Sequence, residues 1–314
     1  GWSEFHRPSY SDLSSEELQW FQVPKGRHLE DVIASLGGER TEADVFLMIR
    51  LARLSHIFQI KAGFYRLSAS GSLYEHLTKI SRGEVAQGKL RVVEGWNRWQ
   101  VRQAWVGNGW LETKEFDRLC DDRGLLQEFQ LPGKTCEGFL FPETYLFSYG
   151  IAPKEIFRTL YGKYKNVVNA VSNEAGTFGP LNLTELEFVT LASIVEKETA
   201  QAKERPRIAC VFYNRLRSKP PWRLETDPTV IYAARLSDPE FDGNLKSYHL
   251  RKMNHPYNTY RTKGLPPGPI ANVSLDAMRA VIAPAQCGDF FFVSNNNGEH
   301  IFCPTLSCHN RAVQ

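Results

Sequence analysis

The sequence predicts an α+β protein in which a small amino-terminal module precedes a larger mixed domain. Residues 20–90 alternate short strand-like runs with amphipathic helical patterns, whereas long helical patterns and a few late strand-like runs occupy the remainder of the chain. The composition agrees with this class, because 42% of the 314 residues are apolar and 23% are charged, as in an ordinary globular protein long enough for two domains.

The elements of the amino-terminal module are predicted from the spacing of its apolar residues. A strand is expected at 20–23, and a helix with one apolar face is expected over 29–36. A second helix follows Thr41. The alternating segment 62–67 predicts another strand, and the last helix of the module is expected at 72–81.

The larger domain is expected to be mainly helical and to end in a hairpin. Thr113 and Thr184 are expected to cap helices, and on local chemistry alone Asp227 caps a helix whose first turn contains Pro228. Prolines fix the backbone and remove hydrogen-bond donors, so the segment after Gly264 is a stiff loop. The expected elements are, in chain order, a strand at 89–94, a helix at 113–129, a compact loop at 137–145, helices at 153–171, after 184 and from 227, the loop 264–270, and a hairpin of 289–293 with 300–302.

One carboxylate stands out in the helix predicted after Thr184. Residues 191–199 read Leu-Ala-Ser-Ile-Val-Glu-Lys-Glu-Thr, and a rotation of about 100° per residue places Glu198 beside apolar side chains such as Val195. Glu196 then points to nearly the opposite side. Because a carboxyl on a desolvated stripe has a raised pKa, it holds a proton near neutral pH, as a general acid must. Glu198 is therefore the candidate acid.

A structural interpretation of Glu198 stays open at this point. A glutamate near the end of a helix is usually the edge of the buried face and pairs with a cation. Three cations, Lys203, Arg205 and Arg207, follow closely enough to serve as that partner.

The charge pattern argues against a nucleic-acid partner. The net charge is only +3, and no run of five or more lysines and arginines is present. No apolar run approaches the roughly 18 residues of a membrane span, and no signal segment opens the chain. Because the chain begins at Gly1 rather than at a methionine, we expect that a membrane anchor has been removed from it.

The six cysteines permit disulfides in an oxidising compartment but do not require them. The cluster His300-x2-Cys303-x4-Cys308-His309 offers four side chains able to bind a metal. Its spacing matches no standard zinc pattern, in which paired ligands come as Cys-x2-4-Cys and His-x3-5-His. We therefore expect no metal here, and either a disulfide or free buried thiols.

Five segments in order identify a family. They read Leu-Ala-Ser-Ile-Val-Glu-Lys-Glu-Thr at 191–199, Val-Phe-Tyr-Asn-Arg-Leu at 211–216, Thr-Asp-Pro-Thr-Val-Ile-Tyr at 226–232, Tyr-Asn-Thr-Tyr at 257–260, and Gly-Leu-Pro-Pro-Gly-Pro-Ile-Ala-Asn at 264–272. Together they closely resemble the MltG (YceG-like) endolytic murein transglycosylases, and the resemblance covers nearly the whole chain after residue 20.

The resemblance implies a domain organisation and a location. It implies a bacterial enzyme of the cell envelope that is tethered by one membrane helix to the extracytoplasmic face of the inner membrane and that associates with peptidoglycan synthases. The expected domains are an amino-terminal extension at 1–19, a LysM-like domain at 20–88, and a YceG-like catalytic domain at 89–314 with a helical insertion at about 105–175.

The resemblance also implies the reaction and the residues that carry it. The family cuts the bond from N-acetylmuramic acid to N-acetylglucosamine in nascent glycan strands, leaves 1,6-anhydro ends and so terminates strand elongation, without a cofactor. Its catalytic glutamate falls on Glu198, the residue that helix geometry selects independently. The expected substrate-binding residues are Asn214, Arg215, Glu225, Asp227, Thr229, Tyr257, Asn258, Tyr260 and His300, and His309 also matches a family position.

Two departures from the family pattern concern the surroundings of this acid. Glu225 stands where the family typically has glutamine, and a second acid either raises the pKa of Glu198 or activates water. Phe302-Cys303 replaces the usual Phe-Ser after the late histidine. Two other functions therefore remain open, namely a lysozyme-like muramidase and a non-catalytic scaffold that binds peptidoglycan.

Overall fold

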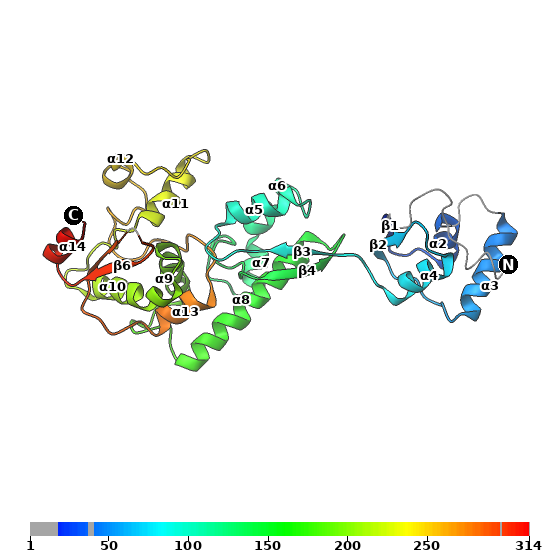
Figure 1. The fold of residues 1–314 in the computed structure, drawn as a ribbon, viewed down its shortest axis with the longest axis horizontal. Coiled ribbons are helices and arrows are strands. Elements are labelled where there is room, and N and C mark those ends of the chain that lie inside the picture. Colours follow the sequence, from blue (N-terminus) through cyan, green and yellow to red (C-terminus); the bar gives the residue numbers. More distant parts are fainter. Residues whose placement is uncertain (1–17, 37–40, 296, 314) are drawn as a thin grey trace. The chain divides into compact units, whose positions relative to one another are not determined.

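The computed structural model describes residues 18–36, 41–295 and 297–313 (Figure 1). The expected amino-terminal extension lies, up to residue 17, outside the described residues. The chain divides into two compact units. The first unit contains the residues up to 90 and also a later segment, 145–152. The sequence did not predict that this later segment belongs to the first unit. The second unit contains 91–144 and 153–314.

The first unit combines a two-stranded antiparallel sheet with three helices. Its elements follow the predicted periodicity closely. Thr41 and Ser72 each accept a hydrogen bond from the third backbone N–H of the helix that follows, so both helices begin where a capping box places them. The elements are β1 (Leu18–Val23), α2 (Leu29–Leu36), α3 (Glu42–Leu54), β2 (Gly63–Ser68) and α4 (Leu73–Arg82).

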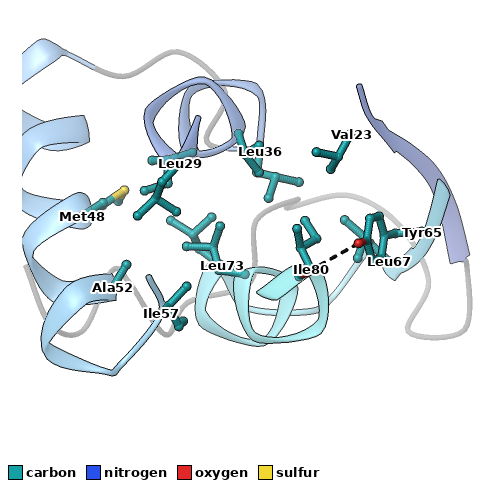
Figure 2. Close-up of a cluster of buried hydrophobic side chains, with 13 residues drawn as sticks. Val23, Leu29, Leu36, Met48, Ala52, Ile57, Tyr65, Leu67, Leu73 and Ile80 are labelled. Atoms are coloured by element: carbon teal, nitrogen blue, oxygen red, sulfur yellow. Dashed lines mark hydrogen bonds between the residues drawn. The ribbon is translucent and has the colours of Figure 1, made fainter. Parts of the chain in front are cut away.

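A single apolar core holds these elements together (Figure 2). Leu36 of α2, Met48 of α3 and Leu73 of α4 are each no more than 2% exposed. The fully buried Tyr65 directs its hydroxyl to the carbonyl oxygens of Lys61 and Ile80. Each large apolar side chain buried in this way contributes about 1.5–3 kcal/mol, so the first unit has a core of its own.

The second unit is mainly helical, and two of its predicted elements differ from expectation. The predicted strand at 89–94 ends at Arg91, because Gly95 adopts φ 71° and Asn97 caps the next helix. The helix predicted at 113–129 is two helices, since the Asp122 side chain accepts from the N–H of Leu125 and starts a new one. The expectation that Thr113 caps a helix was wrong, because the cap position is Glu112.

The remaining elements run from residue 87 to the end of the described chain. The predicted capping by Thr184, the proline loop and the late antiparallel hairpin are all confirmed, although Asn296 of the hairpin turn lies outside the described residues. The strands β3 (Gln87–Arg91) and β4 (Thr144–Ser148) pair in a sheet of their own, and all of their residues except Arg91 and Thr144 belong to the first unit. The elements from residue 87 onward are β3 (Gln87–Arg91), α5 (Arg98–Gly107), α6 (Thr113–Cys120), α7 (Arg123–Glu128), β4 (Thr144–Ser148), α8 (Pro153–Ala175), α9 (Glu185–Glu198), a 3₁₀ turn η1 (Ala202–Glu204), α10 (Arg205–Arg217), α11 (Asp227–Ser237), α12 (Ser247–Arg251), α13 (Leu275–Ile282), β5 (Phe291–Ser294), β6 (His300–Cys303) and α14 (Leu306–Val313).

Helix α9 is the central helix of the second unit. It packs against α10, α11 and α13, and its residues from Phe188 to Glu196 are buried (Figure 1). All three disulfides belong to the second unit and join Cys120 to Cys136, Cys210 to Cys287 and Cys303 to Cys308. No helix in the described ranges carries an apolar stretch long enough to span a bilayer.

Candidate active site

Burial alone does not distinguish the two glutamates at the end of α9. Because the helix is buried on nearly every side, it has no isolated apolar stripe, and Glu196 is 8% exposed whereas Glu198 is only partly buried. The expectation of one carboxylate on a single apolar face was therefore wrong in detail. The difference between the two acids lies in their partners.

Glu196 is a structural residue. One of its carboxylate oxygens accepts a hydrogen bond from the guanidinium of Arg205 at 2.7 Å, and the other accepts from the backbone N–H of Ser274 at 2.9 Å and from its hydroxyl. Both side chains of the ion pair are buried, at 7% exposure for Arg205 and 3% for Glu196. This pair ties α9 to the start of α10 and to the cap of α13.

None of the three cations proposed as structural partners binds Glu198. Lys203 pairs with Glu299, Arg205 pairs with Glu196, and Arg207 pairs with Asp289. The structural interpretation of Glu198 as one half of an ion pair therefore has no support from these residues.

Glu198 instead faces the residues at the start of α11. The hydroxyl of Thr226 donates a hydrogen bond to its Oε1. Burial raises the pKa of Glu198 to about 7, and the carboxylate of Asp227 acts in the same direction. The Thr226 hydrogen bond and the nearby His300 and Arg215 oppose this rise. At neutral pH, Glu198 is consequently divided between its acid and base forms.

Thr226 is the functional candidate that the sequence analysis missed. It occupies the N-cap position of α11, where Asp227 had been expected, but its side chain makes no capping hydrogen bond. The hydroxyl is free for Glu198 for that reason. Asp227 is the first residue of α11, and its Oδ1 accepts a hydrogen bond from the hydroxyl of Tyr260 at 2.7 Å. The assignment of Asp227 as the cap was therefore wrong.

Arg215 supplies a buried positive charge close enough to Glu198 to oppose the rise in its pKa. Its Nε donates to the carbonyl of Phe290 at 2.8 Å, and its Nη1 donates to the carbonyl of Leu224. Burial lowers the pKa of the guanidinium, while Glu225 and Glu198 oppose that change. Since both hydrogen bonds go to backbone carbonyls, Arg215 pairs with no carboxylate among the described residues, and it fixes the loop that carries Thr226.

Glu225 is exposed and takes an unusual backbone conformation, with φ 49°. Its N–H donates to the carbonyl of Thr259 at 3.2 Å, which joins the loop before α11 to the segment that ends at Tyr260. The negative charge that raises the pKa of Glu198 comes from Asp227, whereas Glu225 acts on Arg215 and Tyr260.

His300 reaches the site through a second carboxylate. Its Nδ1 and its backbone N–H each lie 2.8 Å from an oxygen of Glu204, which also accepts from the Thr199 hydroxyl at 3.1 Å. Burial raises the pKa of Glu204, but these hydrogen bonds outweigh it and lower the pKa overall. His300 thereby positions the residue that follows Glu198. His309 stacks on Phe291 instead.

Three other predicted site residues hold loops in place, and they donate hydrogen bonds to backbone carbonyls rather than to Glu198. Asn214 donates to the carbonyls of Cys287 and Asp289 at 3.1 and 2.9 Å. Thr229 donates to the carbonyl of Thr226 at 2.8 Å. The fully buried Asn258 donates to three carbonyls, those of His249, Leu250 and Met253, at 2.9, 3.2 and 2.9 Å.

Tyr257 and Tyr260 line two separate cavities. The ring of Tyr257 packs on Tyr232 with centroids 5.0 Å apart, beside a cavity of about 310 Å³ that also contains Glu137. Burial raises the pKa of Tyr257 to about 12 and that of Glu137 to about 7. Glu137 accepts hydrogen bonds from the N–H of Arg98 and the hydroxyl of Tyr232, so it serves the start of α5.

The cysteine and histidine cluster near the carboxyl terminus does not form a metal centre. Cys303 and Cys308 form a disulfide, as one of the two expectations had it. Across the described part of the chain, no group of three histidine, cysteine, aspartate or glutamate side chains is placed to hold a metal ion.

The similarity to known proteins covers both the fold and the sequence around this acid. The model of the YceG-like family matches residues 21–314. The chain belongs to the YceG-like family. It is 27% identical in sequence to the YceG-like protein lmo1499 of Listeria monocytogenes, whose crystal structure it matches with a TM-score of 0.63 over 95% of this chain and 99% of that one.

Two relatives have named activities. The endolytic murein transglycosylase of Bacillus subtilis (strain 168) is 30% identical over an alignment of 273 residues that covers 81% of this chain and 72% of that protein. The endolytic murein transglycosylase of Streptococcus pneumoniae serotype 2 is 27% identical over 96% of this chain, which spans 59% of that relative's length.

Proposed function

We propose that this protein is an endolytic murein transglycosylase and that Glu198 is its catalytic acid and base. The observation that carries the proposal is the state of Glu198. Burial raises its pKa to about 7, Thr226 is its hydroxyl partner and, among the described residues, no cation is bound to it, unlike Glu196 two residues earlier. The names of the relatives supply the substrate, which is the glycan of peptidoglycan.

A single carboxyl group is enough for this reaction. Protonated Glu198 donates its proton to the glycosidic oxygen, and the 6-hydroxyl of the same N-acetylmuramic acid attacks the anomeric carbon. The carboxylate then accepts the proton of that hydroxyl, and a 1,6-anhydro end results. Intramolecular attack provides an effective molarity of about 10⁵ to 10⁸ M, and proton transfer by a positioned side chain adds about 10² to 10⁴ in rate.

A lysozyme-like muramidase is the second candidate, and the carboxylates beside Glu198 favour it. Hydrolysis needs a second carboxylate to attack the sugar or to activate water. Asp227 is the candidate for this second carboxylate, because its charge raises the pKa of Glu198. Its Oδ1, however, already accepts a hydrogen bond from the hydroxyl of Tyr260. Mass spectrometry of the products separates the two reactions, since anhydro ends are lighter than hydrolysed ends by one water.

The experiment that tests the proposal is the substitution Glu198→Gln, assayed on purified peptidoglycan strands. We expect cleavage to fall to background while binding to the strands is retained. Glu174→Gln, an exposed glutamate of α8, is the matched control and keeps full activity. Unchanged turnover of Glu198→Gln rejects the assignment, and absence of cleavage by the unmodified protein favours the non-catalytic scaffold.

The location and the domains of the protein are part of the same proposal. A substrate in peptidoglycan places the protein in the cell envelope, and we propose the extracytoplasmic face of the inner membrane, a membrane tether and synthase partners on the family resemblance alone. We also retain the LysM-like, glycan-binding assignment for residues 20–88 and the catalytic domain at 89–314. A separate core in the first unit supports this division.

A further inference from the structure

A basic pocket adjoins the candidate acid. It is a cavity of about 340 Å³ lined by Arg223, Leu250, Arg251, Tyr260 and Arg261. The three arginines are exposed, and Leu250 and Tyr260 are half-buried. The pocket therefore presents guanidinium groups around an apolar and aromatic floor.

Tyr260 connects the pocket to Glu198. It lines the cavity, and its hydroxyl donates to Asp227, the residue after the threonine that binds Glu198. The other link is Arg223, which precedes that threonine, Thr226, by three positions in the same loop. A ligand that lies across Glu198 consequently has this cavity within reach of its substituents.

Hydrogen bonds tie together the two backbone segments that form the pocket. The side-chain amide of Asn258 donates to the carbonyls of Leu250 and Met253 on either side of Arg251, and its Oδ1 accepts from the N–H of Tyr260. The guanidinium of Arg261 donates to the carbonyl of Arg251 at 2.8 Å. The arginines thus sit on two backbone segments that are tied to each other.

No ion pair engages the arginines of the pocket in the part of the chain that the structure describes, although the carboxylates of Asp227 and Glu225 lie close enough to Tyr260 to add to the rise that burial causes in its pKa. Arg205 and Arg207 each pair with a carboxylate, whereas Arg223, Arg251 and Arg261 form no ion pair there. Three adjacent cations repel one another, so an anion is the ligand that relieves the arrangement. The planar guanidinium is suited to a carboxylate, which it binds through two parallel hydrogen bonds.

We propose that this basic pocket binds a carboxylate of the peptide that substitutes the muramoyl residue at the cleaved bond, and that the enzyme prefers peptide-bearing strands. The inference rests on the proposed function, because only that function brings a peptidoglycan strand to Glu198. The sugar rings of such a strand carry neutral hydroxyl and N-acetyl groups, so its peptides supply the negative charge.

The test compares peptide-bearing strands with stripped strands, from which an amidase has removed the peptides and in which the lactyl carboxylates that this exposes have been converted to neutral amides. Arg223→Gln and Arg251→Gln each remove a charge whose side chain makes no hydrogen bond within the described ranges. For each variant we expect KM for peptide-bearing strands to rise about fivefold, with kcat unchanged and with no change on stripped strands. Arg279→Gln, an exposed arginine of α13, is the control. Equal losses on both substrates, or no loss on either, overturn the proposal.

A binding measurement separates this proposal from the proposed function. With Glu198→Gln as the background, calorimetry measures the affinity for a disaccharide that carries its peptide and for the same disaccharide without it, its lactyl group being capped as a neutral amide. If the affinity gained from the peptide disappears in Arg223→Gln and Arg251→Gln, the pocket assignment stands even where no cleavage is detected. If that gain persists in both variants, the assignment fails even for an active enzyme.

Phosphate is the other oxyanion that arginines bind, and a lipid-linked nascent strand carries pyrophosphate at its end. Stripped strands with and without that lipid pyrophosphate distinguish the two sources. Dependence on Arg223 and Arg251 that survives removal of the peptides, and that requires the pyrophosphate, overturns the peptide assignment. If the dependence on Arg223 and Arg251 disappears when the peptides are removed, the peptide assignment is supported. The preference for peptide-bearing strands should also weaken as the salt concentration is raised.

Discussion

At the scale of single residues, pairing separates the two acids at the end of α9. Glu196 is the more buried of the two, yet a buried arginine and two donors of Ser274 engage both of its carboxylate oxygens. Glu198 is less buried, and its only hydrogen bond in the described structure comes from a neutral hydroxyl. A proton donor needs the second environment, because a cation would hold the carboxylate in its charged form.

The hydrogen bond from Thr226 leads to a prediction about pH dependence. Glu198 acts first as an acid, so the rate falls as the pH rises through its pKa of about 7. The Thr226 hydrogen bond lowers that pKa. In Thr226→Val the pKa therefore rises, and the alkaline limb of kcat/KM moves to higher pH by about one unit.

The measurement is a pH–rate profile for the unmodified protein, for Thr226→Val and for Thr159→Val. The last of these changes an exposed threonine of α8 that donates only to its own helix. A limb that stays in place, or moves to lower pH, in Thr226→Val contradicts the role given to this hydroxyl.

At the scale of elements, the sequence indicated Glu198 and the helices around it but not the partners of the acid. Apolar periodicity and capping boxes are local, so α2, α4 and the start of α9 agree with their predicted positions. Thr226 and Tyr260 come together with Glu198 only through tertiary packing. The roles of Asn214, Asn258 and Thr229 could not be read from their spacing, because each binds backbone of a separate loop or turn.

The same packing explains why one predicted helix cap was wrong. Asp-Pro ordinarily marks aspartate as the cap and proline as the first helical residue. Here the helix starts one residue earlier, and the carboxylate of Asp227 is bound by Tyr260, which lies 33 residues later in the chain. A tertiary hydrogen bond thus replaces a local one at the position next to the candidate acid.

The pairing of α9 with α10 and α13 can be tested through Glu196. Glu196→Gln removes the charge that compensates the buried Arg205, and breaking such a pair costs about 3–5 kcal/mol. We expect the midpoint of urea unfolding to lie at a lower urea concentration than in the unmodified protein, while kcat of the folded protein stays unchanged. The pattern is opposite to that of Glu198→Gln, which loses activity and keeps stability. If a fully folded Glu196→Gln variant loses turnover, the assignment of the catalytic role to Glu198 rather than to Glu196 is wrong.

At the scale of the whole molecule, covalent reinforcement is unequal. The three disulfides all lie in the second unit, whereas the first unit depends on its apolar core. A disulfide stabilises mainly by restricting the unfolded chain, and the effect increases with the length of the closed loop. The bridge from Cys210 to Cys287 spans 77 residues and the one from Cys120 to Cys136 spans 16.

This distribution predicts different responses of the two units to reduction. Loops of these lengths correspond to about 4–5 and about 3 kcal/mol, so a reductant should lower the unfolding temperature of the second unit and leave that of the first unchanged. Calorimetry with and without reductant measures this, and Leu73→Ala, which leaves a cavity in the core of the first unit, identifies the transition of that unit. The variant Cys210→Ser/Cys287→Ser should reproduce most of the shift and lower activity at elevated temperature, because that bridge anchors the strand segment to which Asn214 and Arg215 bind. If the first transition moves as far as the second, the units do not unfold independently and the assignment of stability to separate cores is wrong.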